Sequence, residues 1–229
     1  MKARLLELRE LAPEIRHFVF EVPERSSLEF EAGQFFSLSG PVNGSTITRA
    51  YSVAAPPSGN RFELCLNRVS EGRFSPLLFS LEPGDEIDCK GPYGTFTLRQ
   101  PVTDSVFIAT GTGIAPFRAI LREQLAANPE RIFTLIFGVR YVSNLLYCAE
   151  FEQMEQQHPN FRFWPTLSRP DASWKGRAGH VQSHLDEAIG ERRDITVYAC
   201  GLKAMVDDVR RILKEKGFDR RQIVYEKYD

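Results

Sequence analysis

The chain has 229 residues, of which 42% are hydrophobic and 26% charged, and its formal net charge is −1. This length suits one large or two modest domains of an ordinary globular protein, and the small charge argues against nucleic acid or an anionic membrane as a partner. Residues 1–7 include several charges and lack the apolar core of a signal peptide, and no apolar run approaches the roughly 20 residues of a membrane span. We therefore expect a cytoplasmic protein that binds neither nucleic acid nor membrane.

Up to about residue 100, short alternating runs separated by Gly/Pro turns predict strands at 15–22, 33–38, 49–54, 61–69 and 86–90. One helix is expected from Ser75 to about Leu81, with Ser75 as its N-cap and Pro76 at the first helical position. Strands at this spacing with one short helix predict a small antiparallel β-barrel.

Beyond residue 100, apolar β-rich runs alternate with helical patterns. Strands are predicted at 105–109, 132–138, 161–166, 195–199 and 222–225, and helices at 115–127, 147–157, 179–189 and 202–216. This alternation predicts an α/β domain with a doubly wound parallel sheet. We therefore expect two domains, 1–98 and 99–229, joined around residues 91–105.

The four cysteines are scattered without a C-x-x-C pair: Cys65, Cys89, Cys148 and Cys200. Zinc and iron–sulfur sites need closely spaced thiolates, so we expect no metal site. His180 and His184 lie four residues apart on a predicted helix, but the sequence offers no third ligand beside them.

The segment Arg49-Ala50-Tyr51-Ser52 combines a cation, an aromatic ring and a hydroxyl in a predicted strand. Side chains alternate along a strand, so Arg49 and Tyr51 share one face and Ala50 and Ser52 the other. A guanidinium suits a phosphate, and a Tyr ring suits a flat heterocycle. An isolated segment of this kind is more often an ordinary strand with an exposed Arg.

The segment Gly72-Arg73-Phe74-Ser75 precedes the short predicted helix. A helix start presents free N–H groups and a partial positive charge, which together can hold an anion. Arg49 could supply a full positive charge opposite it. Without that partner, the segment is more often a capped helix with no ligand.

The run Gly111-Thr112-Gly113, followed by Ile-Ala and Pro116, comes directly after an apolar strand and opens a helix. This is the context of a glycine turn that lets backbone approach a pyrophosphate, with Pro116 starting the helix at a fixed φ. Pro116 stands where a third glycine would be. The run by itself therefore fits a dinucleotide site and an ordinary strand–helix turn equally well.

Two features remain: Cys200-Gly201 at the carboxyl end of a predicted strand, and the tail that ends in Glu226, Tyr228 and Asp229. Ligands of open α/β sheets bind beyond the carboxyl ends of the strands, although a Cys there is often only core. The tail could be a solvated edge strand or a lid over a flat cofactor.

In this order and spacing the five features resemble one family, the ferredoxin–NADP reductase-like flavoproteins, over the whole chain. The matching motifs are R-x-Y-S, G-x-x-S, G-T-G-I-A-P, C-G and the terminal E-x-Y. The resemblance implies a flavin-binding barrel followed by a nicotinamide dinucleotide-binding domain.

The resemblance also implies roles for these positions. Arg49 and the Gly72–Ser75 segment would hold the flavin pyrophosphate, with Tyr51 on one isoalloxazine face and Ser52 near N5. The backbone of the glycine turn, with Thr112, would bind the nicotinamide dinucleotide. Cys200-Gly201 would lie beside the nicotinamide during hydride transfer. Glu226 would relay protons and Tyr228 would cover the other flavin face, with Tyr225 as a second candidate.

Coenzyme choice depends on the region from Ser168-Arg169 to Arg177, where arginines could grip a ribose 2′-phosphate. We expect NADP(H), although Asp171 would disfavour a dianion and keeps NADH possible. The resemblance favours FAD over FMN as the flavin.

Because the cysteine run of a fused iron–sulfur domain is missing, electrons would leave to a separate ferredoxin, flavodoxin or oxygenase component, and we expect a monomer. Two alternatives stay open. One is a diffusible flavin or quinone reductase, against which Arg49 argues. The other is a non-catalytic flavin-binding subunit, against which Ser52, Cys200 and Glu226 argue.

Overall fold

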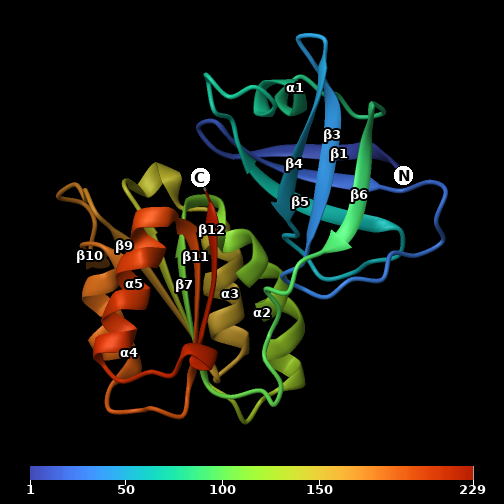
Figure 1. The fold of residues 1–229 in the computed structure, drawn as a ribbon. Coiled ribbons are helices and arrows are strands. Elements are labelled where there is room, and N and C mark those ends of the chain that lie inside the picture. The colour runs from blue at the N-terminus through green and yellow to red at the C-terminus, as the bar shows by residue number, and fades with distance from the viewer. Residues whose placement is uncertain (229) are drawn as a thin grey trace.

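The computed structural model describes residues 1–228 and contains two six-stranded sheets (Figure 1). The strands of the first are β1 (Lys2–Ala12), β2 (Ile15–Glu21), β3 (Phe35–Val42), β4 (Ser45–Ser52), β5 (Arg61–Asn67) and β6 (Glu86–Tyr93). They pair antiparallel in the order β4-β3-β6-β1-β2-β5, and α1 (Ser75–Phe79) lies between β5 and β6. The predicted antiparallel domain is confirmed.

β1 was not predicted from the sequence. Irregularities in its pairing with β2, between Leu5 and Glu7 and between Glu10 and Ala12, interrupt the apolar alternation that would reveal a strand. The β3–β4 hairpin was also missed, and of the strand predicted at 49–54 only residues 49–52 belong to β4, at its end. Its turn, Asn43-Gly44, has positive φ at both residues, as a two-residue hairpin turn requires.

The predicted capping role of Ser75 is wrong. Phe74 is the N-cap of α1, and Ser75 is its first helical residue. The Ser75 hydroxyl instead accepts a hydrogen bond of 2.9 Å from the backbone N–H of Val69. It therefore closes the loop before the helix and leaves the helical N–H groups alone.

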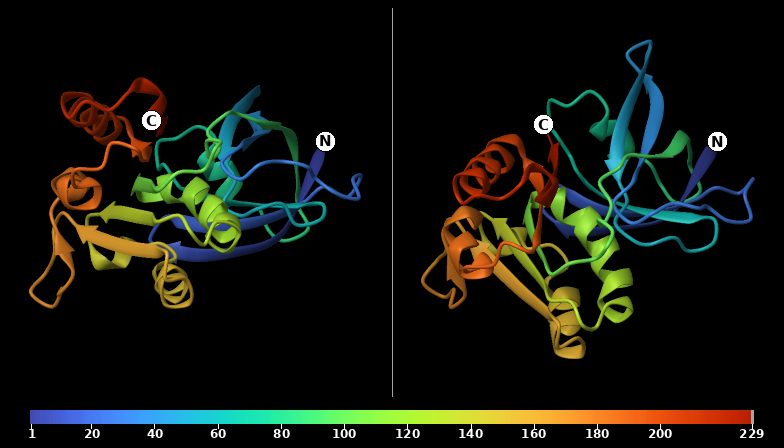
Figure 2. Two further views of the ribbon diagram at one scale, coloured as in Figure 1. Left: turned by 90° about the horizontal axis from the view of Figure 1, so that it is seen from below. Right: turned by 60° about the horizontal axis from the view of Figure 1, so that its bottom comes forward.

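The second sheet is parallel, with the order β10-β9-β8-β7-β11-β12. Its strands are β7 (Ser105–Thr110), β8 (Phe133–Val139), β9 (Phe161–Leu167), β10 (Arg177–Ala178), β11 (Thr196–Leu202) and β12 (Ile223–Tyr228). The helices α2 (Ala115–Ala127) and α3 (Cys148–Gln157) pack on one face, and α4 (Leu185–Ile189) and α5 (Lys203–Glu215) on the other (Figure 2). The doubly wound α/β domain is confirmed.

Of the four helices predicted in the second domain, one differs clearly from the observed element. The helix at 179–189 is a 3₁₀ turn, Val181–His184, followed by the short α4. The helix predicted at 115–127 is confirmed as α2, and a 3₁₀ turn, Gly111–Ile114, precedes it. Two other 3₁₀ turns, Val142–Asn144 and Arg220–Gln222, precede α3 and β12. None of the helices in residues 1–228 is both long and apolar enough to cross a membrane.

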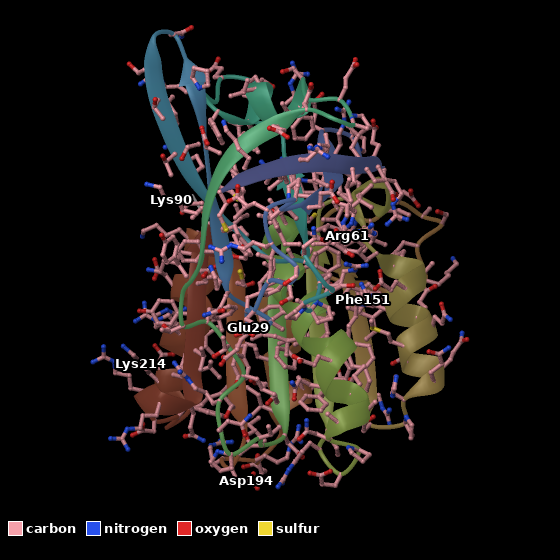
Figure 3. All side chains as sticks on the ribbon, turned by 90° about the vertical axis from the view of Figure 1, so that its right-hand side faces the viewer. Glu29, Arg61, Lys90, Phe151, Asp194 and Lys214 are labelled. Atoms are coloured by element: carbon pink, nitrogen blue, oxygen red, sulfur yellow. The ribbon has the colours of Figure 1, made fainter. Side chains whose placement is uncertain are left out.

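The apolar core on the α2–α3 face continues into the barrel. One buried cluster joins Phe36 and Leu64 of the barrel to Phe117 of α2 and Phe151 of α3. The α4–α5 face has a separate cluster that includes Val206 and Val209. The parallel strands point toward the barrel (Figure 1), and Asp194, before β11, lies at the end of the molecule away from it (Figure 3). The carboxyl ends of the strands, where ligands of such sheets bind, thus face the first domain.

Candidate active site between the two domains

A hydrogen bond joins the two domains at the centre of the site. The Ser52 hydroxyl, at the end of β4, donates to Oε1 of Glu226 on β12 over 2.6 Å. Glu226 pairs in register with Cys200 on β11, and Leu202 pairs with Tyr228. The structure therefore brings together the four residues that the resemblance assigned to the chemistry, three of them from the end of the second sheet.

Burial sets the protonation of this cluster. It raises the pKa of Glu226, although hydrogen bonds with the Ser52 and Tyr228 hydroxyls oppose the shift. Burial, followed by the charge of Glu226, raises the pKa of the Cys200 thiol well above its usual value. Burial and the neighbouring Cys200 and Glu226 do the same for Tyr228. The thiol and the phenol thus keep their protons at neutral pH, and Glu226 is the group that can exchange one.

Tyr225 and Tyr228 lie on opposite sides of β12. Val224 and Tyr228 pack against the core shared with the barrel. Tyr225 is 41% exposed and packs under the guanidinium of Arg210 on α5, which lies 3.8 Å from the ring centroid. Of the two candidate tyrosines, the structure brings only Tyr228 to Ser52, while Asp229 lies outside the described residues.

The residues of β4 present a cation next to an aromatic ring. Arg49 is exposed, and its guanidinium donates to the Thr48 carbonyl over 2.8 Å, with no acidic partner among residues 1–228. Ala50 beside it is also exposed. Tyr51 is half-buried, and burial raises its pKa to about 12 against the charge of Arg49. The strand therefore offers an exposed guanidinium without an acidic partner in residues 1–228, and a neutral ring, to an anionic, aromatic ligand.

The loop before α1 offers backbone donors. A Cβ on Gly72 would lie 2.8 Å from the Val69 carbonyl oxygen, so the loop closes this tightly only with glycine. Within residues 1–228, the N–H groups of Arg73, Phe74 and Ser75 donate to no protein atom. Free N–H groups together with Arg49 are a donor set that suits a pyrophosphate.

The glycine turn is pressed against the strand that carries Cys200. A Cβ on Gly113 would overlap the Cys200 carbonyl, and one on Gly201 would overlap the Thr110 hydroxyl. Gly111 has a φ of +54° and open space around it, so its backbone is accessible to a ligand. These contacts fix Cys200 beside a turn whose shape suits a dinucleotide.

Of the arginines predicted for coenzyme choice, one is already engaged. Arg177 donates to both carboxylate oxygens of Glu187 over 2.5 and 2.6 Å and stacks on Trp164. Arg169 is exposed, next to half-buried Ser168, and its backbone N–H donates to the carbonyl of the exposed Arg140 over 3.0 Å. Sequence reasoning missed Arg140, although its position directly after β8, at the carboxyl end of a parallel strand, is the signal that could have identified it.

The histidine pair forms no metal centre in the part of the chain that the structure describes. His184 Nε2 lies 2.9 Å from the Thr166 hydroxyl. Across residues 1–228, no group of three His, Cys, Asp or Glu side chains is arranged to hold a metal ion.

Comparison with known proteins identifies both domains. The family model for the oxidoreductase FAD-binding domain matches residues 2–98, and that for the oxidoreductase NAD-binding domain matches residues 107–211. Ferredoxin–NADP reductase B of Sorangium cellulosum is 38% identical and covers 100% of this chain and 97% of its own length. The reductase subunit of an Amycolatopsis aromatic O-demethylase is 34% identical, over 100% of this chain and 69% of that protein.

Solved structures of reductases have the same two-domain fold. The Amycolatopsis cytochrome P450 reductase GcoB has a TM-score of 0.89 at 32% identity, covering 99% of this chain and 69% of that chain. A ferredoxin NADP⁺ reductase from Neisseria gonorrhoeae with bound FAD and NADP has a TM-score of 0.83 at 26% identity, covering 99% and 98%.

Proposed function

The chain belongs to the ferredoxin–NADP reductase-like family of flavoproteins, and from this premise we propose how its own residues carry out the reaction. It is an NAD(P)H-dependent oxidoreductase that uses FAD and passes electrons to a separate partner. When bound, FAD takes up an electron pair as hydride and can release it as single electrons. The observation that carries the proposal is the Ser52–Glu226 hydrogen bond between the domains, beside Cys200.

Two sets of groups bind the cofactors in this proposal. Arg49 and the free N–H groups of Arg73, Phe74 and Ser75 hold the FAD pyrophosphate, and Tyr51 supplies an aromatic face. The open backbone of the glycine turn, with Thr112, holds the nicotinamide dinucleotide pyrophosphate. Both sets are neutral N–H donors or cations, as a pyrophosphate requires.

In this proposal, the residues around Ser52 exchange protons and control the access of the nicotinamide to the flavin. Glu226 takes up or gives up a proton through its hydrogen bond with the Ser52 hydroxyl. The Cys200 thiol stays neutral, so it would lie beside a bound nicotinamide without adding charge. Tyr228 is half-buried on the same side of β12 as Glu226 and must move for the nicotinamide to reach the flavin.

We propose NADPH as the preferred coenzyme. The exposed, adjacent Arg169 and Arg140 can grip a 2′-phosphate, whereas Arg177 is paired with Glu187 and plays a smaller part. NADH is the alternative, because the Asp171 carboxylate lies in the same loop and would repel a dianion. Arg169→Ala and Arg140→Ala should each raise KM for NADPH about tenfold or more and leave KM for NADH unchanged. Equal effects on both coenzymes would contradict the assignment.

The proposed acceptor is a one-electron carrier: a ferredoxin, a flavodoxin or the oxygenase component of a two-protein system. The names of the relatives, a ferredoxin–NADP reductase and a demethylase reductase subunit, support this class. A monomeric state and a cytoplasmic location are proposed from the sequence.

Anaerobic stopped-flow mixing of the purified protein with NADPH, and separately with NADH, tests the proposed function. Rapid loss of the oxidised flavin absorbance is expected with NADPH. Bound flavin that neither nucleotide reduces would favour the non-catalytic subunit. Purification without flavin, but turnover of added flavin, would favour the diffusible flavin reductase.

A further inference from the structure

A second cluster of polar side chains lies between the domains. Arg118 of α2 is 6% exposed, and its guanidinium meets carboxylates from both domains. Nε donates to the two oxygens of Glu150 on α3 over 3.0 and 2.8 Å, and Nη1 donates to Glu63 on β5 over 2.8 Å. His17 Nε2 lies 3.3 Å from the same Glu63 oxygen, and its Nδ1 lies 2.9 Å from the Tyr147 hydroxyl.

Arg118 also reaches the segment that follows Ser52. Nη1 donates over 2.7 Å to the carbonyl oxygen of Ala54, two residues after Ser52. The Ala54 N–H donates to the Glu63 carbonyl over 2.8 Å, so the segment lies between β5 and α2. This guanidinium is therefore a direct polar link from the second domain to the segment that carries Tyr51 and Ser52.

The N-terminal end of α2, which carries Arg118, is also fixed to the nicotinamide side of the site. The turn that opens α2 contains Gly113, which has no room for a Cβ against the Cys200 carbonyl. Arg118, in the first turn of α2, lies five residues after Gly113. The contacts form a closed ring. Ser52 is hydrogen-bonded to Glu226, which pairs with Cys200, and Cys200 packs against the glycine turn. The turn leads into α2, and Arg118 of α2 donates to Ala54, which follows Ser52 along the chain.

We propose that Arg118 is a positioning residue for hydride transfer, which sets the separation between the Tyr51–Ser52 segment and Cys200. This inference rests on the proposed function. The ring has two polar links between the domains, Ser52–Glu226 and Ala54–Arg118, and the first is made by groups that take part in the chemistry. Arg118 is the link that stays in place while those groups exchange protons or move.

Physical chemistry supports positioning rather than added stability. Burying a guanidinium is costly, and a buried ion pair can often be replaced by apolar side chains without loss of stability. A guanidinium is, however, a planar fork of five donors with fixed directions. Here it satisfies acceptors from three separate segments, Ala54, Glu63 and Glu150, and a methionine or leucine of similar size would leave their relative positions undetermined.

The test compares Arg118→Met and Arg118→Lys with Arg122→Met in the FAD-loaded protein. Arg122 approaches the same carboxylates of Glu63 and Glu150 only at 3.9 and 3.8 Å, so its variant is the matched control. We would measure the limiting rate of flavin reduction, the Kd for NADPH, and the long-wavelength charge-transfer absorbance of the nicotinamide–flavin complex. Hydrogen exchange at the Ala54 amide is a readout independent of turnover.

Arg118→Met should lower the limiting rate on the order of 100-fold, because small misplacements of reacting groups cost this much. NADPH affinity should change less than threefold, the charge-transfer band should weaken, and the Ala54 amide should exchange faster. Arg118→Lys should recover part of the rate, and Arg122→Met should stay within about twofold of the unmodified protein.

A folded Arg118→Met protein with an unchanged limiting rate and charge-transfer band would overturn the proposal and leave Arg118 a purely structural residue. Should Arg118→Met fail to fold, Arg118→Lys decides by the same rate and band, with its thermal midpoint as the fold control. An unmodified protein whose flavin neither NADPH nor NADH reduces would refute the proposed function instead. If the hydrogen-exchange rate of the Ala54 amide is unchanged in the Arg118 variants, that result alone would refute the positioning role.

Discussion

Replacing Glu63 with Gln removes one negative charge from the cluster that Glu63 forms with His17 and Arg118, with little change in side-chain shape. Burial by itself would raise the pKa of this carboxyl group, but hydrogen bonds from His17 and Arg118 and the charge of Arg118 outweigh it. The pKa falls from 4.5 to about 2. The folded protein therefore holds Glu63 as the carboxylate much more strongly than the unfolded chain does.

The size of the effect follows from this shift. Each pKa unit corresponds to about 1.4 kcal/mol, and the Glu63 side chain is 26% exposed, so solvent screens part of the interaction. At neutral pH we expect Glu63→Gln to lower the free energy of unfolding by about 2 to 3 kcal/mol. Because the folded pKa is depressed, this stability is present above pH 4.5 and is lost as pH falls toward 2.

Urea unfolding of both proteins, with a constant excess of FAD, at neutral pH and at several pH values down to about 3 gives the measurement. The difference between the two proteins should shrink steadily below pH 4.5. Glu29→Gln is the control, because Glu29 is exposed and makes no ion pair within residues 1–228; Figure 3 labels it. A stability difference that stays constant from neutral to acidic pH would refute the reasoning.

Three further predictions concern the site. Cys200→Ala should slow flavin reduction by NADPH roughly tenfold or more while FAD stays bound, and an unchanged rate in stopped flow would remove Cys200 from the reaction. Arg49→Ala should weaken FAD binding by about 1.5 to 3 kcal/mol in a fluorescence titration, since charge-assisted hydrogen bonds contribute this much; undiminished affinity would exclude the pyrophosphate role. Glu226→Gln should gain stability relative to the unmodified protein as pH rises from 4.5 through the raised pKa of Glu226, because the carboxyl must otherwise ionise while buried. Urea unfolding across this range checks it, and a difference that does not change with pH would contradict it.

The sequence by itself determined the order of the two domains and most of the strands around the site. Apolar periodicity and Gly/Pro turns are local signals, so they identify a parallel sheet and the glycine turn at Gly111 without any knowledge of packing. The same signals failed where pairing is irregular, as in β1, and where a hydroxyl had a better partner than the expected one, as at Ser75.

Only the tertiary structure decided which groups meet. Alternation along β12 shows that Tyr225 and Tyr228 face opposite ways, but not which way is toward the barrel, because that depends on which sheet face α5 covers. Likewise, the sequence pattern does not distinguish Arg118 from the other charged residues of its helix. Its bond to Ala54, 64 residues earlier, exists because the two domains share one core, and contacts at this separation leave no mark in the local pattern.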